Sequence, residues 1–68
     1  MYENLYPDFE ERYQEAVQIV KDTKQCSATM LQRKLRIGFV YSGRIVDRME
    51  QERLVSPYRG SSPREVYI

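Results

Sequence analysis

The segment "LQRKLRIGFVYSGRIVDRME", residues 31–50, contains two apolar patterns of helical period separated by an "RIG" break at residues 36–38. Four arginines and one lysine are distributed through it. A glycine at position 38 can adopt a positive φ that ends one helix and lets the next begin at a steep angle. The segment therefore predicts two helices joined by a tight turn, with Gly38 in the left-handed conformation.

The helices on both sides of the break are predicted from their apolar spacing. After the break, a helix is expected over residues 39–52, and its buried stripe should consist of Ser42, Ile45, Val46 and Met49. Before the break, Ser27 is a good N-cap for a short helix over residues 28–35. One side of that short helix should carry Met30, Leu31 and Leu35.

A further helix is expected upstream, over residues 8–24. Pro7 and Asp8 suit a helix start, and acidic residues follow where the helix dipole is positive. The expected apolar stripe consists of Phe9, Tyr13, Ala16, Val17 and Val20. Residues 1–7 show no clear period and are interpreted as a flexible lead-in, so the folded domain is expected to cover residues 8–68.

The hydrophobic period changes after Leu54. The stretches "RLVSPYRG" and "SPREVYI" are short and contain β-branched and aromatic residues, and "RGSSP" between them is typical of a turn. Two strands are expected over residues 54–58 and 64–68, with Pro57 and Pro63 at edges or strand starts. The predicted fold class is therefore α+β: a winged helix-turn-helix with three helices followed by a two-stranded β-hairpin wing.

Charge is distributed unevenly along the chain. Residues 1–24 contain six acidic and three basic residues, whereas residues 25–68 contain four acidic and eight basic residues. Seven of those eight basic residues are arginines, whose planar guanidinium fits phosphates and guanine edges. This asymmetry favours a polyanionic partner for the second half of the chain.

The composition argues against several classes of function. Cys26 is the only cysteine and there is no histidine, which excludes an internal disulfide, a His/Cys metal site and a histidine base. The sequence has no Gly-rich phosphate loop and no nucleophile–base pair, so no catalytic residue, metal or cofactor is expected. The absence of a disulfide fits a reducing, cytoplasmic setting. No apolar run approaches the roughly 20 residues of a membrane span, so this segment is expected to make no membrane contact.

The order of elements predicts how a winged-helix domain of this kind would bind double-stranded DNA. In winged helices the third helix enters the major groove and the wing contacts the backbone. Tyr41, Arg44, Arg48 and Gln51 are expected on the side of that helix opposite its buried stripe. Bases would be read by Tyr41, Arg44, Asp47 and Arg48. Phosphate contacts would come from Arg33, Lys34, Arg36, Arg59 and Arg64.

Three stretches carry a family resemblance: "QEAVQIV", "SATMLQRKLRIGFVYSGRIVDRMEQERLV" and "SPREVYI". Together, over about residues 13–68, they resemble the C-terminal gamma domain of the FtsK/SpoIIIE DNA translocases. The resemblance implies a winged helix that recognises short, polarised, G-rich chromosomal sequences and orients a hexameric motor during chromosome segregation. It also implies contact with a Xer-type recombinase, and a motor domain in a membrane-anchored bacterial parent protein, with this domain on the cytoplasmic side.

The start of the third helix departs from the family pattern. The family has a Tyr-Asn-Arg run after the glycine, whereas this chain has Phe39, Val40 and Tyr41. Val40 replaces an asparagine that is expected to touch a base, and Tyr41 replaces an arginine. Arg44 and Asp47 match base-reading positions of the family. The resemblance therefore implies base-reading positions that include Val40, with an altered sequence preference.

The sequence leaves two other functions open. The domain could be a protein-docking winged helix with weak or lost DNA binding, because Val40, Tyr41 and Gly43 make the start of the third helix less polar than a DNA reader needs. It could also be a free-standing small transcriptional regulator that binds a palindromic operator as a dimer. For Arg48, the alternative to a base contact is an ion pair with Glu52, one helical turn further on.

Overall fold

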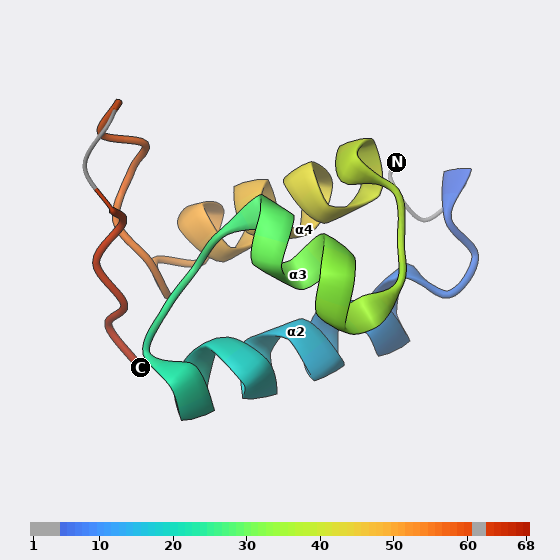
Figure 1. Ribbon diagram of the computed structural model, residues 1–68, viewed down its shortest axis with the longest axis horizontal. Coiled ribbons are helices and arrows are strands. Elements are labelled where there is room, and N and C mark those ends of the chain that lie inside the picture. The colour runs from blue at the N-terminus through green and yellow to red at the C-terminus, as the bar shows by residue number, and fades with distance from the viewer. Residues whose placement is uncertain (1–4, 61–62) are drawn as a thin grey trace.

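The computed structural model describes residues 5–60 and 63–68, in which the labelled helices are α2 (Phe9–Thr23), α3 (Ala28–Leu35) and α4 (Phe39–Gln51) (Figure 1). These bounds confirm the three helices expected from the sequence, to within one residue at each end. Residues 1–4 of the expected lead-in lie outside the described part of the chain, as do residues 61–62 of the expected turn.

Helix α2 carries one apolar face along its whole length. Its buried residues are Phe9, Tyr13, Ala16 and Val20, and Val17 is half-buried beside them. Glu10 and Glu11 in the first turn and Lys21 in the last turn have the charges that the helix dipole favours. Lys24 follows as the C-cap of the helix, with a left-handed φ of 59°, and donates its backbone N–H to the Val20 carbonyl.

Helices α3 and α4 are joined by a tight turn at residues 36–38. Ser27 caps α3 as expected, because its hydroxyl accepts the Met30 backbone N–H at 3.3 Å. The left-handed residue of the turn, however, is Arg36, with φ 57°, while Gly38 is extended at φ −70° and ψ 161°. The expectation for Gly38 was wrong because α3 already ends at Leu35, so the left-handed C-cap falls on the next residue and Gly38 becomes the N-cap of α4.

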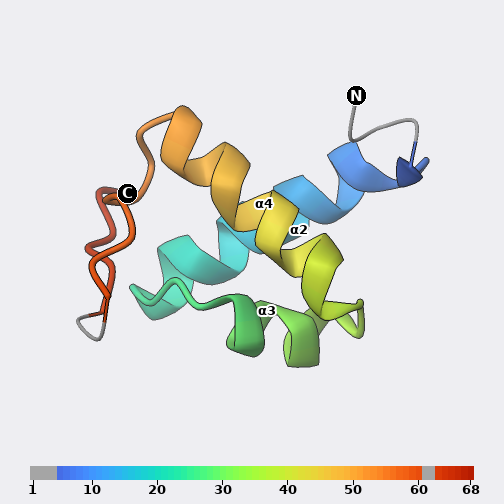
Figure 2. The ribbon, with the colours of Figure 1, turned by 90° about the horizontal axis from the view of Figure 1, so that it is seen from above.

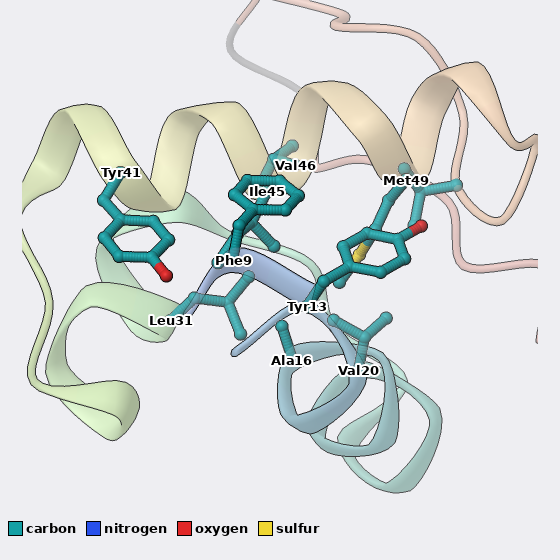
Figure 3. Packing of buried hydrophobic residues seen from close by; sticks show 10 residues of the cluster. Phe9, Tyr13, Ala16, Val20, Leu31, Tyr41, Ile45, Val46 and Met49 are labelled. Carbon is teal, nitrogen blue, oxygen red and sulfur yellow. The ribbon is translucent and has the colours of Figure 1, made fainter. Parts of the chain in front are cut away.

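The core lies where α4 crosses α2, with α3 packed against both (Figures 2 and 3). Its buried hydrophobic residues are Phe9, Tyr13, Ala16, Val20, Leu31, Tyr41, Ile45, Val46, Met49 and Val55. Three rings at its centre are nearly parallel: the Phe9 ring centroid lies 6.1 Å from that of Tyr13 and 6.0 Å from that of Tyr41. Such pairs stabilise a core by about 0.5–1.5 kcal/mol beyond their buried area.

The C-terminal segment corrects the predicted fold class. Over the described residues it contains no strand, only an isolated antiparallel bridge between Val55 and Val66, so the fold is all-α rather than α+β with a β-hairpin wing. Pro57 and Pro63 have no backbone N–H, so neither can donate to a strand ladder. Two backbone hydrogen bonds, from Ser56 N–H to the Glu65 carbonyl and from Tyr67 N–H to the Leu54 carbonyl, both at 2.9 Å, flank the bridge without extending into a sheet.

Side chains rather than a sheet hold this segment against the end of the molecule where α2 and α4 finish (Figures 1 and 2). Arg64 donates to Glu50 on α4 and to the Ser56 carbonyl, both at 2.9 Å. At the other end, Lys24 Nζ, just after α2, donates to a main-chain oxygen of Ile68 at 2.6 Å. Within the segment, the Ser56 hydroxyl accepts the Glu65 backbone N–H at 2.8 Å. The C-terminal segment is thus tied to both long helices.

Candidate nucleic-acid interface

One side of α4 points away from the core, and we call it the outer face of α4. The residues buried on the opposite side are Tyr41, Ser42, Ile45, Val46 and Met49. Because a helix turns about 100° per residue, the positions farthest from that stripe are Val40, Gly43, Arg44, Asp47 and Gln51. Val40, Asp47 and Gln51 are exposed, and Gly43 and Arg44 are half-buried. Three of the expected base-reading residues, Val40, Arg44 and Asp47, thus share one side of a helix.

Tyr41 lies on the other side, so the expectation that it faces outward with Arg44 was wrong. It is only 8% exposed, because it precedes Ile45 by one helical turn on the buried stripe. Its ring stacks on Tyr6 with centroids 4.0 Å apart, and its hydroxyl donates to Asp8 Oδ1 at 2.6 Å. Burial, followed by this hydrogen bond, raises the pKa of Tyr41, and the same bond lowers the pKa of Asp8.

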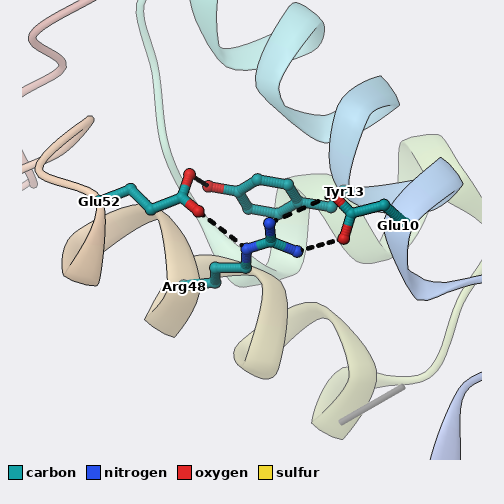
Figure 4. A network of polar contacts seen from close by, with 4 residues as sticks. All are labelled: Glu10, Tyr13, Arg48 and Glu52. Atoms are coloured by element: carbon teal, nitrogen blue, oxygen red, sulfur yellow. Dashed lines mark hydrogen bonds and ion pairs between the residues drawn. The ribbon is translucent and has the colours of Figure 1, made fainter.

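Arg48 turns from the edge of α4 toward α2 (Figure 4). Its guanidinium donates to Glu10 at 2.5 and 3.2 Å and to Glu52 at 3.0 Å, and it lies 4.2 Å from the centroid of the Tyr13 ring. Tyr13 in turn donates its hydroxyl to Glu52 at 2.7 Å. The ion pair with Glu52 that the sequence left open is present.

This network shifts the pKa values of its members. The pKa of Glu10 is lowered mainly by the hydrogen bond from Arg48, and the pKa of Glu52 mainly by the hydrogen bond from Tyr13. The pKa of Arg48 is raised, with its bond to Glu10 as the largest cause. Arg48 on α4 pairs with Glu10 on α2 and with Glu52 just after α4. These ion pairs therefore link the two helices.

The residues expected to contact phosphates fall into two groups. Arg33, Lys34 and Arg36 are exposed at the C-terminal end of α3, next to the turn that leads into α4. In the C-terminal segment, Arg59 is exposed and pairs with Glu65 at 3.1 Å. The Arg64 side chain is only 15% exposed and bonds Glu50. The sequence could not separate these groups, because the partner of Arg64 lies fourteen residues away.

A groove of about 280 Å³ runs between the outer face of α4 and the C-terminal segment. It is lined by residues 26–28, by Gly43, Val46 and Asp47 of α4, and by Tyr58, Pro63 and Arg64. Tyr58 is 74% exposed and is not among the residues that the sequence predicts to contact DNA. The sequence does carry one indication of a contact residue at this position: Tyr58 lies between Pro57 and Arg59, in the basic half of the chain.

Other site types find no support within the described residues. Cys26 is half-buried beside the groove, and burial raises the pKa of its thiol, which disfavours the reactive thiolate. Among residues 5–60 and 63–68, no three side chains of the metal-binding types gather closely enough to hold an ion. No helix in that part of the chain is both long and apolar enough to span a bilayer.

Comparison with known proteins gives the family. Residues 8–68 match the family model described as the Ftsk gamma domain. DNA translocase FtsK of Bacillus cereus is 48% identical over 59 residues, which cover 87% of this chain and 7% of that protein. DNA translocase FtsK of Caldanaerobacter subterraneus subsp. tengcongensis is 40% identical over 65 residues, covering 96% of this chain and 9% of that protein.

DNA translocase SpoIIIE of Bacillus subtilis is 44% identical over 59 residues, covering 87% of this chain and 8% of that protein. The chain thus spans less than a tenth of the length of each of these relatives. The match extends from the N-cap of α2 through the C-terminal segment, and so includes the contacts described above except the stacking of Tyr6 on Tyr41. The chain belongs to the FtsK gamma domain family.

Proposed function

We propose that this domain binds double-stranded DNA through the outer face of α4 and serves as a non-catalytic DNA-reading module of an FtsK/SpoIIIE-type translocase. The observation that carries the proposal is the pair Arg44 and Asp47, which share the outer face of α4 with Val40. A guanidinium and a carboxylate one turn apart suit the acceptors of guanine and the amino group of its paired cytosine. Family membership supports the same function.

The residues of the site take distinct roles in this proposal. Arg44 reads guanine O6 and N7, and Asp47 accepts from cytosine N4. Phosphates are contacted by Arg33, Lys34, Arg36 and Arg59, which set the register without reading sequence. We assign Tyr41, Arg48 and Arg64 to supporting the fold, because each is mostly buried and bonds a carboxylate on another element of the domain.

We further propose that the DNA read is a short, polarised, G-rich chromosomal sequence that orients the translocase during chromosome segregation, on the cytoplasmic side of the membrane. The arginine content of the second half and the family membership support this. Contact with a Xer-type recombinase is a second candidate function. It is favoured by the exposed aromatic residues Phe39, Tyr58 and Tyr67, since exposed tyrosines often anchor protein interfaces.

Fluorescence polarisation with labelled duplexes tests the DNA-binding proposal. A G-rich duplex should bind more tightly than a scrambled one of equal length, and the log–log salt slope should be roughly −3 to −5, as expected for about four phosphate contacts. Arg44→Ala should cost on the order of 1–3 kcal/mol on the G-rich duplex. Lys21→Ala, a charge removal on α2, is the matched control and should leave the affinity unchanged. Equal loss for both variants, or no binding at low salt, would contradict the proposal.

The recombinase contact is tested separately, by co-elution of the domain with a purified Xer-type recombinase in the absence of DNA. Replacing Tyr58 by Ser should weaken co-elution if the exposed aromatic residues form the interface. Unchanged co-elution would exclude Tyr58 from the interface.

A further inference from the structure

The start of α4 exposes two large apolar side chains that the core does not use. Val40 is 63% exposed and Phe39 is 59% exposed. Val40 lies at the centre of the outer face of α4, since Arg44 and Asp47 follow it by four and seven residues. The helix therefore presents an aliphatic group, a cation and an anion in a row along one side.

An aliphatic side chain in that position finds few suitable partners on DNA. The edges of the bases in the major groove carry oxygen and nitrogen acceptors and amino donors, and the C5-methyl group of thymine is the one apolar group among them. Valine has no donor or acceptor in its side chain. Against any other base edge it would cover a polar group without replacing the hydrogen bond to water, which is unfavourable.

Resting on the DNA binding proposed above, we propose that Val40 reads the 5-methyl group of a pyrimidine, so that the preferred site contains a thymine close to the base pair faced by Arg44. Four residues of helix advance about 6 Å, and base pairs are stacked about 3.4 Å apart. The thymine is therefore placed within about two base pairs of the one read by Arg44. Phe39 adds apolar surface beside Val40.

The experiment removes only the methyl group. Duplexes enriched by the domain from a randomised pool are resynthesised with uracil in place of thymine, one position at a time, and their dissociation constants are measured by fluorescence polarisation. For the unmodified chain, one thymine should be sensitive, with a loss of about fourfold, as expected for the burial of one methyl group. Thymines elsewhere in the duplex should show no effect when replaced.

Two variants connect that effect to Val40. Val40→Ala should bind thymine and uracil duplexes almost equally, whereas Val40→Ile, which keeps the aliphatic contact, should retain the preference for thymine. Because Val40 is exposed, neither variant should melt below the parent chain, and Val40→Ala should melt slightly above it because alanine favours a helix more than valine. The inference is overturned if no thymine is enriched, if uracil replacement has no effect, or if Val40→Ala keeps the preference. Each of these three results can occur in a chain that still binds DNA, so each contradicts the inference alone. Failure to bind any duplex would overturn the proposed function, and this inference with it.

Discussion

At the scale of single residues, two buried tyrosines hold separate elements together through their hydroxyl groups. Tyr13 on α2 donates to Glu52, which follows α4, and Tyr41 on α4 donates to Asp8, which precedes α2. Each phenol is buried and its partner is a carboxylate, so burial and the hydrogen bond both raise the pKa of the tyrosine. Tyr41, near the start of α4, is therefore used for packing rather than facing outward.

Tyr41→Phe separates these two roles. The variant keeps the ring that stacks on Tyr6 and loses only the hydroxyl that bonds Asp8. We expect a melting temperature lower by a few degrees, as for the loss of one hydrogen bond in a domain of this size. DNA affinity should stay within about twofold of the parent, measured by polarisation below the melting transition. If a folded Tyr41→Phe variant lost much of its DNA affinity, the Tyr41 hydroxyl would have to contact DNA, as the sequence predicted.

At the scale of elements, α4 contains a glycine that the fold does not require. Gly43 lies within the helix on its outer face, and a Cβ built there would have no neighbouring atom within 4 Å. Glycine inside a helix costs about 0.5–1 kcal/mol relative to alanine, because it loses more backbone freedom on folding. No contact within the domain requires the absence of a side chain at Gly43.

We therefore expect Gly43→Ala to raise the free energy of unfolding by about 0.5–1 kcal/mol. Urea denaturation followed by circular dichroism gives the value, with an unchanged m-value as evidence that the cooperative transition is the same. Gly38→Ala is a suitable comparison, since Gly38 also has open space but serves as the extended N-cap outside the helix. A destabilised Gly43→Ala variant would mean that the outer face of α4 is packed against another part of the domain.

At the scale of the whole molecule, charged groups connect parts of the chain that are far apart in sequence. Arg48 reaches Glu10 across thirty-eight residues and Arg64 reaches Glu50 across fourteen. The Arg48 guanidinium also lies 4.2 Å from the centroid of the Tyr13 ring and 5.8 Å from that of Phe9, two of the nearly parallel rings of the core. Arginines that look available for DNA in the sequence thus contribute to the assembly of the domain.

These connections predict a stability that falls at both extremes of pH. Asp8, Glu10 and Glu52 have pKa values lowered from 3.8, 4.5 and 4.5, so the unfolded chain binds more protons below those values, and stability is lost as pH falls through them. Tyr13 and Tyr41 have pKa values raised from 10.0, so their contribution is complete below pH 10 and is lost as pH rises above it.

Melting temperatures recorded between roughly pH 3 and 11 should therefore show a plateau near neutral pH with a decline on each side. Glu52→Gln should make the acid decline shallower, because one of the groups with a lowered pKa no longer titrates. Tyr41→Phe should make the alkaline decline shallower for the corresponding reason. A profile whose shape is the same in all three proteins would show that these contacts do not contribute to folding.

The sequence by itself determined the features that depend on neighbours within one or two helical turns. The spacing of Ile45, Val46 and Met49 located α4, and Ser27 located the start of α3, because helix periodicity and capping act between residues three or four apart. The order and spacing of the sequence motifs also indicated the family that the comparisons establish.

Only the tertiary structure decided which side of α4 each borderline residue occupies and which charges are already engaged. Tyr41 is buried because α2 and Tyr6 supply a surface for its ring, and Arg48 and Arg64 are held by acids on distant parts of the chain. Likewise, the C-terminal segment contains no strand over residues 54–60 and 63–68, because its two prolines cannot donate to a strand ladder and side-chain bonds such as that of Arg64 to Glu50 hold it in place. Such outcomes depend on contacts between elements, which local spacing does not encode.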